Sequence, residues 1–372
     1  MPNPIARGAL RTRLCDRFGI EYPIFAFAHS IEVVAAVTEA GGFGVWGATR
    51  NTPEEIADGL AALHARLGGK PFGVDLVLPQ GMPELDDREA IEREIPAEHR
   101  AFVGDLRTRY GVPEDGQSGM RSRFVRSEQV ARRQIEAVLA SPVAMFAMGI
   151  GSPPETIGRA KATGKTVVSL VGTPKHARRA LELGADLLVA QGYDAGAHTG
   201  TVGTFSLVPR IVDIAGDVPV LAAGGVATGR HVAASLALGA AGVWTGTAWL
   251  ATREHAMEPE IVAKLLQADV DSTVISRADS GKTLRQIKTK WSEEWAADDA
   301  PAPLRMPYQD ILVGDLLGAI DRHRVEPLMH SPAGQSVGYV TGVDSVAEVM
   351  SRLVAEWHAA LDGLVGDSGE MA

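Results

Sequence analysis

The stretch VPVLAAGGVATGRHVAASLALGAAGVWTGTAWLAT, residues 218–252, joins two short apolar runs through a helical segment. The apolar runs are Val220–Ala223 and Gly242–Gly246, and a glycine turn follows each of them. Thr228 is a capping residue at the start of the helical segment, and Gly239 follows its last turn, as helix ends prefer. A strand, a helix and a second strand in this order predict a unit of a parallel sheet.

The same alternation extends back to the first strand of the chain. The other predicted strands are Pro23–Ala28, Gly44–Gly47, Phe72–Leu78, Val143–Met148, Thr166–Val171 and Leu187–Gln191. The helices predicted between strands are Glu54–Arg66, Glu128–Ala140, Pro154–Thr163, Lys175–Leu183 and Gly229–Leu238. Most of the strands are apolar throughout, as strands covered on both faces require. Eight such strands predict an α/β fold, the (β/α)₈ (TIM) barrel.

Two segments depart from this rhythm. Residues 79–126 carry mixed charge and many turn residues, which predicts an insertion after the third strand, over the barrel mouth. After residue 251 the alternation stops, and scattered prolines predict a helical or irregular C-terminal subdomain. Within it, Asp344–Leu361 has the pattern of an amphipathic helix. The predicted domains are therefore a barrel at residues 1–251 and a subdomain at 252–372 that covers the active site.

The bulk composition narrows the classes of function. A formal charge of −10 and a pI near 5.5 argue against a nucleic-acid-binding surface. The lone Cys15 cannot form an intrachain disulfide or a cysteine metal site, and no metal is predicted. Residues 1–20 lack the apolar core of an export signal, and no run of about 20 apolar residues predicts a membrane span. We expect a cytoplasmic protein that acts on a small-molecule substrate. A homodimer is compatible with the sequence.

Glycine turns follow the last two predicted strands, at Gly224-Gly225 and Gly246-Thr247. In a barrel of this kind the ligand site lies at the carboxyl ends of the strands. Without side chains, backbone N–H groups can reach a phosphate, and the helix that follows Gly225 favours an anion at its start. Glycines also serve ordinary tight turns. Two such turns on neighbouring strands nevertheless predict a phosphate site.

The segment LLVAQGYDAGAHTGTVGTFSLVPRI, residues 187–211, places polar groups after the sixth strand. The Gln191 amide can donate to and accept from the edge of a heterocycle. His198 lies in the glycine-rich loop, and the ordinary imidazole pKa of about 6.5 suits proton transfer at neutral pH. We predict that His198 is catalytic; the alternative is that it only orders its loop.

With these features the chain resembles the nitronate monooxygenase (2-nitropropane dioxygenase) family, which consists of FMN-dependent barrels related to flavin-dependent enoyl-acyl carrier protein reductases. The resemblance covers nearly the full length. Besides residues 218–252, its markers are YPIFAFA at 22–28, EAGGFGVWG at 39–47, KPFGVDLVLP at 70–79, AQGYDAGAHTG at 190–200 and GQSVGYV at 334–340. The resemblance implies FMN as cofactor and a monooxygenase that oxidises a small alkyl nitronate with O₂.

The resemblance also implies which residues meet FMN. Gln191 and Gly192 would line the flavin ring, the two glycine turns would hold its phosphate, and Gln335 would close over the site. The full set of implied contacts is Ala26, Phe27, Ala28, Asp75, Gln191, Gly192, Gly196, Ala197, Gly224, Gly225, Gly246, Thr247 and Gln335.

Three positions depart from the family's pattern. Ser169 stands where the fifth strand of the family ends in a histidine base; it is a second catalytic candidate, although a serine cannot take up a proton near neutral pH. Asp75 replaces an asparagine, so a carboxyl group would lie beside the flavin. The first strand, PIFAFAHS at 23–30, lacks the usual Gly-Met pair. His198 or His29 would then supply the base.

Two other functions stay open. An FMN-dependent reductase or dehydrogenase of an acyl-CoA or enoyl thioester would use NAD(P)H or the thioester as partner. Five arginines of the insertion could contact CoA phosphates or form a solvated helix face paired with glutamates. These arginines are Arg121, Arg123, Arg126, Arg132 and Arg133. A non-redox phosphate-binding barrel is the third option, for which Asp75 is the main carboxylate candidate.

Overall fold

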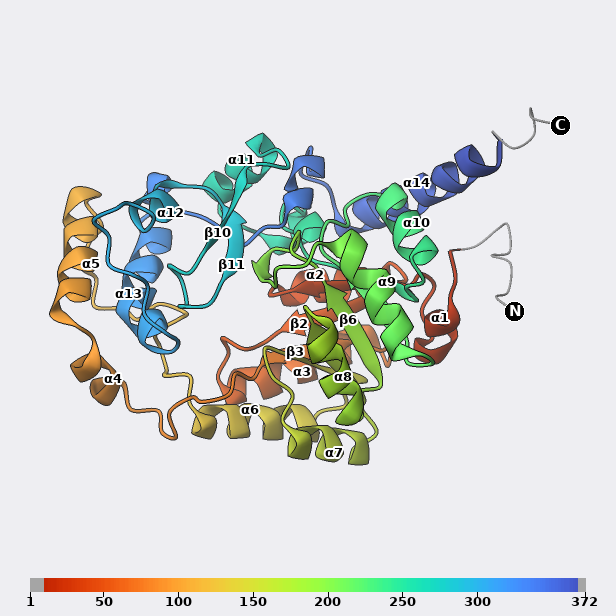
Figure 1. Ribbon diagram of the computed structural model, residues 1–372, viewed down its shortest axis with the longest axis horizontal. Helices are drawn as coiled ribbons and strands as arrows, with labels where there is room; N and C mark the ends of the chain where they lie inside the picture. The colour runs from red at the N-terminus through yellow and green to blue at the C-terminus, as the bar shows by residue number, and fades with distance from the viewer. Residues whose placement is uncertain (1–9, 367–372) are drawn as a thin grey trace.

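Eight parallel strands close into a barrel in the computed structural model, which describes residues 10–366 (Figure 1). The strands are β1 (Ile24–Ala28), β2 (Phe43–Gly47), β3 (Gly73–Val77), β4 (Met145–Gly149), β5 (Thr166–Val171), β6 (Leu187–Gln191), β8 (Val220–Ala223) and β9 (Gly242–Thr245). The barrel and all eight predicted strands are confirmed. Residues 1–9, on which the prediction against an export signal partly rests, lie outside the described range.

Helices connect successive strands and surround the barrel. They are α2 (Ile31–Glu39), α3 (Pro53–Leu67), α6 (Glu128–Ala140), α7 (Pro154–Ala162), α8 (Pro174–Glu182), α9 (Thr204–Ala215) and α10 (Gly229–Ala237). The five predicted helices are confirmed; α2 and α9 were not predicted. The short helix α1 (Arg13–Phe18) adds Leu14 and Phe18 to the barrel core, with the Phe18 ring centroid 4.8 Å from that of Phe43.

Strand residues alternate between the barrel interior and the helix layer. Phe25, Val45 and Val168 pack with one another inside the barrel. Their sequence neighbours Ile24 and Val167 pack in the layer between strands and helices. Both faces of the strands are therefore apolar, which explains why the strands read as continuous apolar runs.

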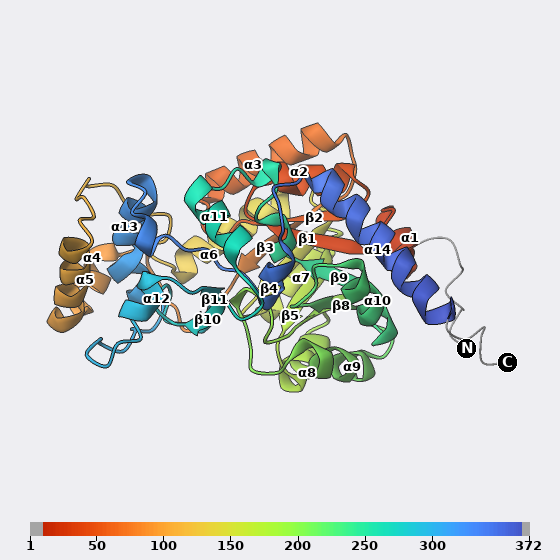
Figure 2. The same ribbon diagram turned by 90° about the horizontal axis from the view of Figure 1, so that it is seen from above.

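The helix that completes the ring comes from the end of the chain. Strand β9 ends at Thr245, whereas α14 spans Val346–Gly366 and packs against α10 and α2 (Figure 2). The approach to α10 is close because a Cβ on Gly229 would lie 2.0 Å from the backbone nitrogen of Trp357. The amphipathic helix predicted at Asp344–Leu361 is confirmed.

A side lobe, formed by residues 79–126 and 252–345, lies beside the barrel (Figure 1). Its elements are α4 (Arg88–Glu94), α5 (Ala97–Arg109), η2 (Arg253–His255), α11 (Pro259–Gln267), β10 (Thr273–Ser276), β11 (Leu284–Ile287), α12 (Lys290–Glu294), α13 (Tyr308–Arg322), η3 (Glu326–Leu328) and η4 (Gln335–Tyr339). Helices α5, α11, α12 and α13 share one hydrophobic core. We therefore propose that the insertion and residues 252–345 form one unit and that α14 belongs to the barrel.

The side lobe contains more regular secondary structure than its scattered prolines predicted. Helix α13 has 15 residues, and nine of them are buried, including Gln309 and Asp310. A helix that is covered on most sides lacks the narrow apolar stripe by which a surface helix is identified in a sequence. Among residues 10–366, none of the helices has both the length and the apolarity needed to span a membrane.

Strand β7 (Ala197–His198) ties the barrel to the side lobe. It belongs to the loop after β6, and it pairs antiparallel with β11, placing His198 opposite Leu284. The resulting small sheet has the order β10-β11-β7. The lobe therefore reaches the carboxyl end of the barrel, where the loops predicted to bind ligand are found.

Candidate active site

The two glycine turns after β8 and β9 form a cradle of free backbone donors. Gly224 and Gly225 have φ angles of +98° and +74°, the left-handed region that favours glycine. A Cβ added at Gly225 or Gly246 would have no atom nearer than 3.6 Å, so neither position is crowded. Within residues 10–366, the backbone N–H groups of Gly225, Gly246 and Thr247 have no hydrogen-bond acceptor. Three N–H groups without an acceptor, at positions that are not crowded, can bind a phosphate. The two turns therefore fit the phosphate of FMN.

The segment before η4 closes over this cradle. The N–H of Gly334 donates to Thr247 Oγ1 at 2.9 Å, and the N–H of Gln335 donates to the carbonyl of Asp194 at 2.9 Å. A Cβ on Gly196 would lie 2.7 Å from the carbonyl carbon of Ala333, so the two segments touch through their backbones. The structure thus brings Gly196 and Gln335 together beside Asp194; that both contact FMN stays a prediction.

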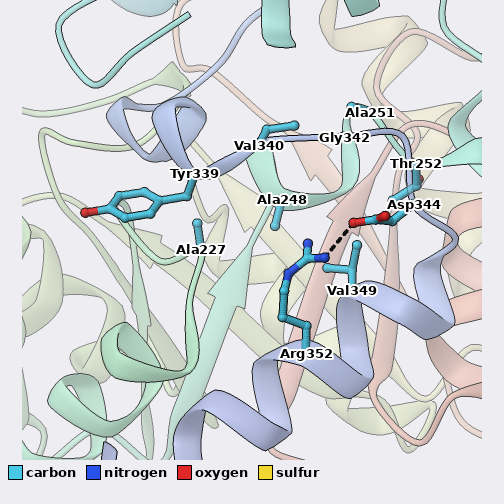
Figure 3. A pocket seen from close by; sticks show the side chains of 10 residues that line it. All are labelled: Ala227, Ala248, Ala251, Thr252, Tyr339, Val340, Gly342, Asp344, Val349 and Arg352. Carbon is cyan, nitrogen blue, oxygen red and sulfur yellow. Dashed lines mark hydrogen bonds and ion pairs between the residues drawn. The ribbon is translucent and has the colours of Figure 1, made fainter.

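A small pocket adjoins the cradle on one side (Figure 3). Ala227 and Ala248 border it from the loops that contain the two glycine turns, and Tyr339 of η4 lies at its left edge in this view. The carboxylate of Asp344 pairs with Arg352 at 2.5 Å along its edge. The space holds about one water molecule. It is therefore too small for a flavin ring.

Residues at the ends of β1 and β6 are oriented differently at the carboxyl end of the barrel. Phe27 packs with the barrel-interior residues, and its ring stacks on Trp244 at 6.3 Å. Ala26 and Ala28 pack toward the helix layer, so only their backbones can face a cofactor. The amide nitrogen of Gln191 donates to the carbonyl of His198 at 2.6 Å, which leaves its oxygen as the group free to meet a flavin edge.

His198 differs from an ordinary histidine. Its Nδ1 lies 3.2 Å from the carbonyl oxygen of Thr283; because a carbonyl can only accept, Nδ1 carries the proton and Nε2 the lone pair. Burial, followed by the positive charges of Arg126 and Arg121, lowers the pKa of His198 to about 4. The expectation of a pKa near 6.5 was therefore wrong. At neutral pH His198 is uncharged and only weakly basic.

Ser169 does not face the barrel interior. Val168 packs inside the barrel, and Val167 and Val171 pack toward the helices, so the alternation turns the Ser169 side chain to the helix side. Its Oγ lies 3.1 Å from Ser152 Oγ, and only 1% of the residue is exposed. The prediction of Ser169 as a catalytic residue is corrected on this ground. His29 is nearer the ligand face, with Nδ1 2.7 Å from the carbonyl of Gly47.

Asp75 is a buried carboxyl group without a partner. The residue is 3% exposed, and its Oδ2 has no hydrogen-bond donor within residues 10–366. Burial raises the pKa of Asp75 to about 7. Close to neutral pH the group is therefore partly protonated, and in that state it can donate a hydrogen bond as an asparagine does. An unpartnered polar atom at this depth is consistent with a cofactor edge that would cover it.

Replacing Asp75 with asparagine should stabilise the protein more at high pH than at low pH. An unfolded aspartate ionises near pH 3.8 but Asp75 near pH 7, so the stability that its neutral form contributes is complete below the unfolded pKa and is lost as the pH rises through about 7. Between pH 4.5 and pH 8, the difference in unfolding free energy between Asp75→Asn and the natural protein should grow by about 3 kcal/mol. Chemical denaturation at pH 4.5 and pH 8 measures it.

The control for this experiment is Asp58→Asn on the exposed side of α3. The difference in unfolding free energy between this variant and the natural protein should be the same at both pH values, because an exposed side chain is solvated in the folded and the unfolded state alike. A difference for Asp75→Asn that does not change with pH would contradict the raised pKa.

The five arginines singled out in the sequence, three in the insertion and two on α6, divide into two groups. Arg132 and Arg133 lie on the exposed face of α6 and pair with Glu84 at 2.5 Å and Glu54 at 2.6 Å. Arg123 pairs with Glu55. Arg132 and Arg133 fit the solvated helix face that was one of the two expectations, whereas Arg123 lies in the loop before α6 with its side chain only 24% exposed.

The other two arginines of the insertion turn inward. Arg121 pairs with the buried Asp279 at 2.9 Å, and Arg126 is partly buried beside Met306. Arg50, which the sequence did not single out, joins them through Asp310 at 3.0 Å. Because 260 residues separate Arg50 from Asp310, no local pattern could have revealed this contact.

Comparison with known proteins places the chain among flavin enzymes. The family model described as "Nitronate monooxygenase" matches residues 11–356. A putative monooxygenase of Mycobacterium tuberculosis, Rv1533, is 40% identical over 96% of this chain and 99% of its own length. A probable nitronate monooxygenase of Staphylococcus aureus strain Newman is 30% identical over 92% and 96%. The solved nitroalkane oxidase of Streptomyces ansochromogenes superposes with a TM-score of 0.80 at 28% identity, covering 94% of this chain and 99% of its own.

Proposed function

The chain belongs to the nitronate monooxygenase family, and from this premise we propose that it is an FMN-dependent oxidoreductase that oxidises a small alkyl nitronate with O₂. The observation that carries the proposal is the cradle of three unpartnered N–H groups at Gly225, Gly246 and Thr247. When bound, FMN supplies the redox chemistry between the nitronate and O₂. The thioester reductase and the non-redox barrel are not favoured, because the family model, the Staphylococcus aureus relative and the solved nitroalkane oxidase are of the nitronate or nitroalkane type.

The residues of the chain favour a nitronate over a neutral nitroalkane. A nitronate has already lost its carbon-bound proton, so its oxidation needs no strong base. His198, with a pKa of about 4, is a weak base, and Ser169 faces the helix layer. The arginine charges that lower the pKa of His198 also stabilise an anion beside it. A site of this kind binds the nitronate more readily than it generates one.

Purified protein supplied with FMN tests the proposal. The flavin absorption spectrum should persist after gel filtration, and the ethyl and propyl nitronates should cause oxygen consumption. Protein that takes up no FMN would contradict the cofactor. Flavin-loaded protein that oxidises neither nitronate, but whose flavin is reduced by NADH or NADPH and reoxidised by an enoyl thioester, would contradict the substrate.

Replacing His198 with alanine should separate the two substrate forms. Turnover of a neutral nitroalkane should fall by about 10²-fold, near the lower end for general-base catalysis, because the weak base that accepts its proton is lost. Turnover of the corresponding nitronate should stay within about twofold, and FMN should remain bound because His198 lies away from the cradle. Oxygen uptake with both forms measures this. If both rates are unchanged, His198 has no catalytic role.

A further inference from the structure

Three arginine side chains converge where the barrel face meets the side lobe, and together with two aspartates they form what we call the arginine junction: Arg50, Arg121, Arg126, Asp279 and Asp310. Arg50 follows β2, and Arg126 comes immediately before the N-cap of α6, so both lie at the carboxyl end of the barrel. Asp310 Oδ1 lies 3.0 Å from Arg50 Nη2 and 3.7 Å from Arg121 Nη1. The two aspartates thus form ion pairs with Arg50 and Arg121.

Arg126 is the guanidinium without a carboxylate. Within residues 10–366 its only hydrogen-bonding contact is from Nη1 to the Met306 sulfur at 3.6 Å, a weak acceptor. Its Nε is buried and has no acceptor at all. A partly desolvated cation with neither a counter-ion nor full hydration is costly. Its fork of donors is therefore available to a planar or tetrahedral anion.

The charges of the junction do not cancel. Three guanidinium groups face two carboxylates, and the carboxylate of Asp279 also contacts His330 Nε2 at 3.1 Å. Burial lowers the pKa of His330, but the Asp279 carboxylate outweighs that effect and raises it. Asp321 also interacts with His330, Arg121 and Asp279, but the positive charge of Arg126 faces no carboxylate within hydrogen-bonding distance among residues 10–366. Opposite charge brought by a ligand would balance it.

The excess charge reaches the reaction site. Arg126, directly before the N-cap of α6, and His198, in the loop after β6, both lie at the carboxyl end of the barrel, and among the charged groups Arg126 lowers the pKa of His198 most. A ligand whose reactive group lies beside His198 can therefore place a second group at Arg126. We propose that Arg126 is an anion-binding residue of the substrate site and that it holds a carboxylate or a phosphate carried by the substrate away from its reacting carbon. This inference rests on the proposed function for the nature of the reacting group.

The substitution Arg126→Gln tests the subsite with a matched pair of substrates. The nitronates of 3-nitropropanoate and 1-nitropropane have the same carbon chain, and only the first carries a carboxylate. For the carboxylate-bearing nitronate, the variant should raise KM about 10- to 100-fold with kcat within about twofold, the loss of one hydrogen bond to a charged group. KM for the 1-nitropropane nitronate should not change. Arg126→Lys, which keeps the charge, should recover part of the loss.

Arg132→Gln is the control, because Arg132 lies six residues away on the exposed face of α6. It should leave KM for both nitronates unchanged. Bound FMN and the unfolding temperature show that each variant is folded.

Inhibition by phosphate compounds distinguishes whether Arg126 holds a carboxylate or a phosphate. Coenzyme A and inorganic phosphate are added as inhibitors of 1-nitropropane nitronate oxidation. If they inhibit the natural protein but not Arg126→Gln, while KM for the carboxylate-bearing nitronate is equal in both, the residue holds a phosphate. If neither the carboxylate nor the phosphate depends on Arg126, the inference is wrong.

Calorimetry separates this inference from the proposed function. The FMN-loaded protein is titrated with 3-nitropropanoate and with coenzyme A, and no turnover is needed. Binding that is lost in Arg126→Gln supports the subsite even if no nitronate is oxidised. Binding of both compounds that is unchanged in Arg126→Gln overturns it even if nitronates are oxidised.

Discussion

Replacing Gly225 with aspartate should yield a protein that purifies without FMN. The glycine lies in the cradle with φ +74°, and its missing Cβ would meet only the Asp194 side chain, at an ordinary contact distance of 3.6 Å. A carboxylate there would occupy the anion site beside the free N–H groups of Gly246 and Thr247. Two unit charges about 4 Å apart near a protein surface interact by about 4 kcal/mol. We therefore expect the Kd for FMN to rise roughly 10³-fold.

Gly225→Asn is the matched control. Asparagine has the same shape as aspartate and tolerates the left-handed backbone equally well, so steric effects and strain are alike in the two variants. It should weaken FMN binding far less because it brings no charge. Fluorescence titration with FMN measures both constants. Equal Kd values for the two variants would show that no phosphate binds here.

The second large effect is expected at Asp310, whose substitution by alanine should destabilise the protein by about 3 kcal/mol or more. The residue is 1% exposed, and its Oδ1 serves both Arg50 and Arg121. Removing one partner of a buried ion pair leaves the other charge desolvated and unpaired, which typically costs 3–5 kcal/mol. Thermal and denaturant unfolding of the FMN-loaded protein measure the change.

Asp105→Ala is the comparison for this prediction. Asp105 pairs with Arg109 at 2.7 Å within α5, and both side chains are exposed. Its loss should cost less than about 1 kcal/mol, as for other surface pairs. If the two variants lose the same stability, the arginine junction has no special weight in the fold.

The barrel was predictable from the sequence because each strand is a short apolar run that ends at a turn. Val220–Ala223 and Leu187–Gln191 were placed to the residue. Such runs can be recognised in a sequence because both faces of a parallel strand are buried, so most residues of the strand are apolar. Strand β7 could not be found in this way, since its two residues lie inside a glycine-rich loop and pair only with the distant β11.

The candidate site was predictable where function rests on the backbone and not where it rests on side-chain direction. The turns at Gly224-Gly225 and Gly246-Thr247 are visible as residue types and fit a phosphate in the structure. Ser169 was assigned from its place at a strand end, but the two-residue alternation turns it outward. The low pKa of His198 depends first on burial and then on arginines from other loops, including Arg50, and only the folded chain provides either.

The late position of α14 has a consequence for biosynthesis. All eight strands have been made once Thr245 is added, yet the helix that covers the last of them ends at residue 366. At about 5–20 residues per second, the ribosome needs roughly ten seconds to add the intervening chain. During that interval the nascent barrel exposes the apolar strip that Leu353 and Trp357 later bury. The newborn chain therefore passes through a stage at which chaperones can bind it and at which it is prone to aggregate.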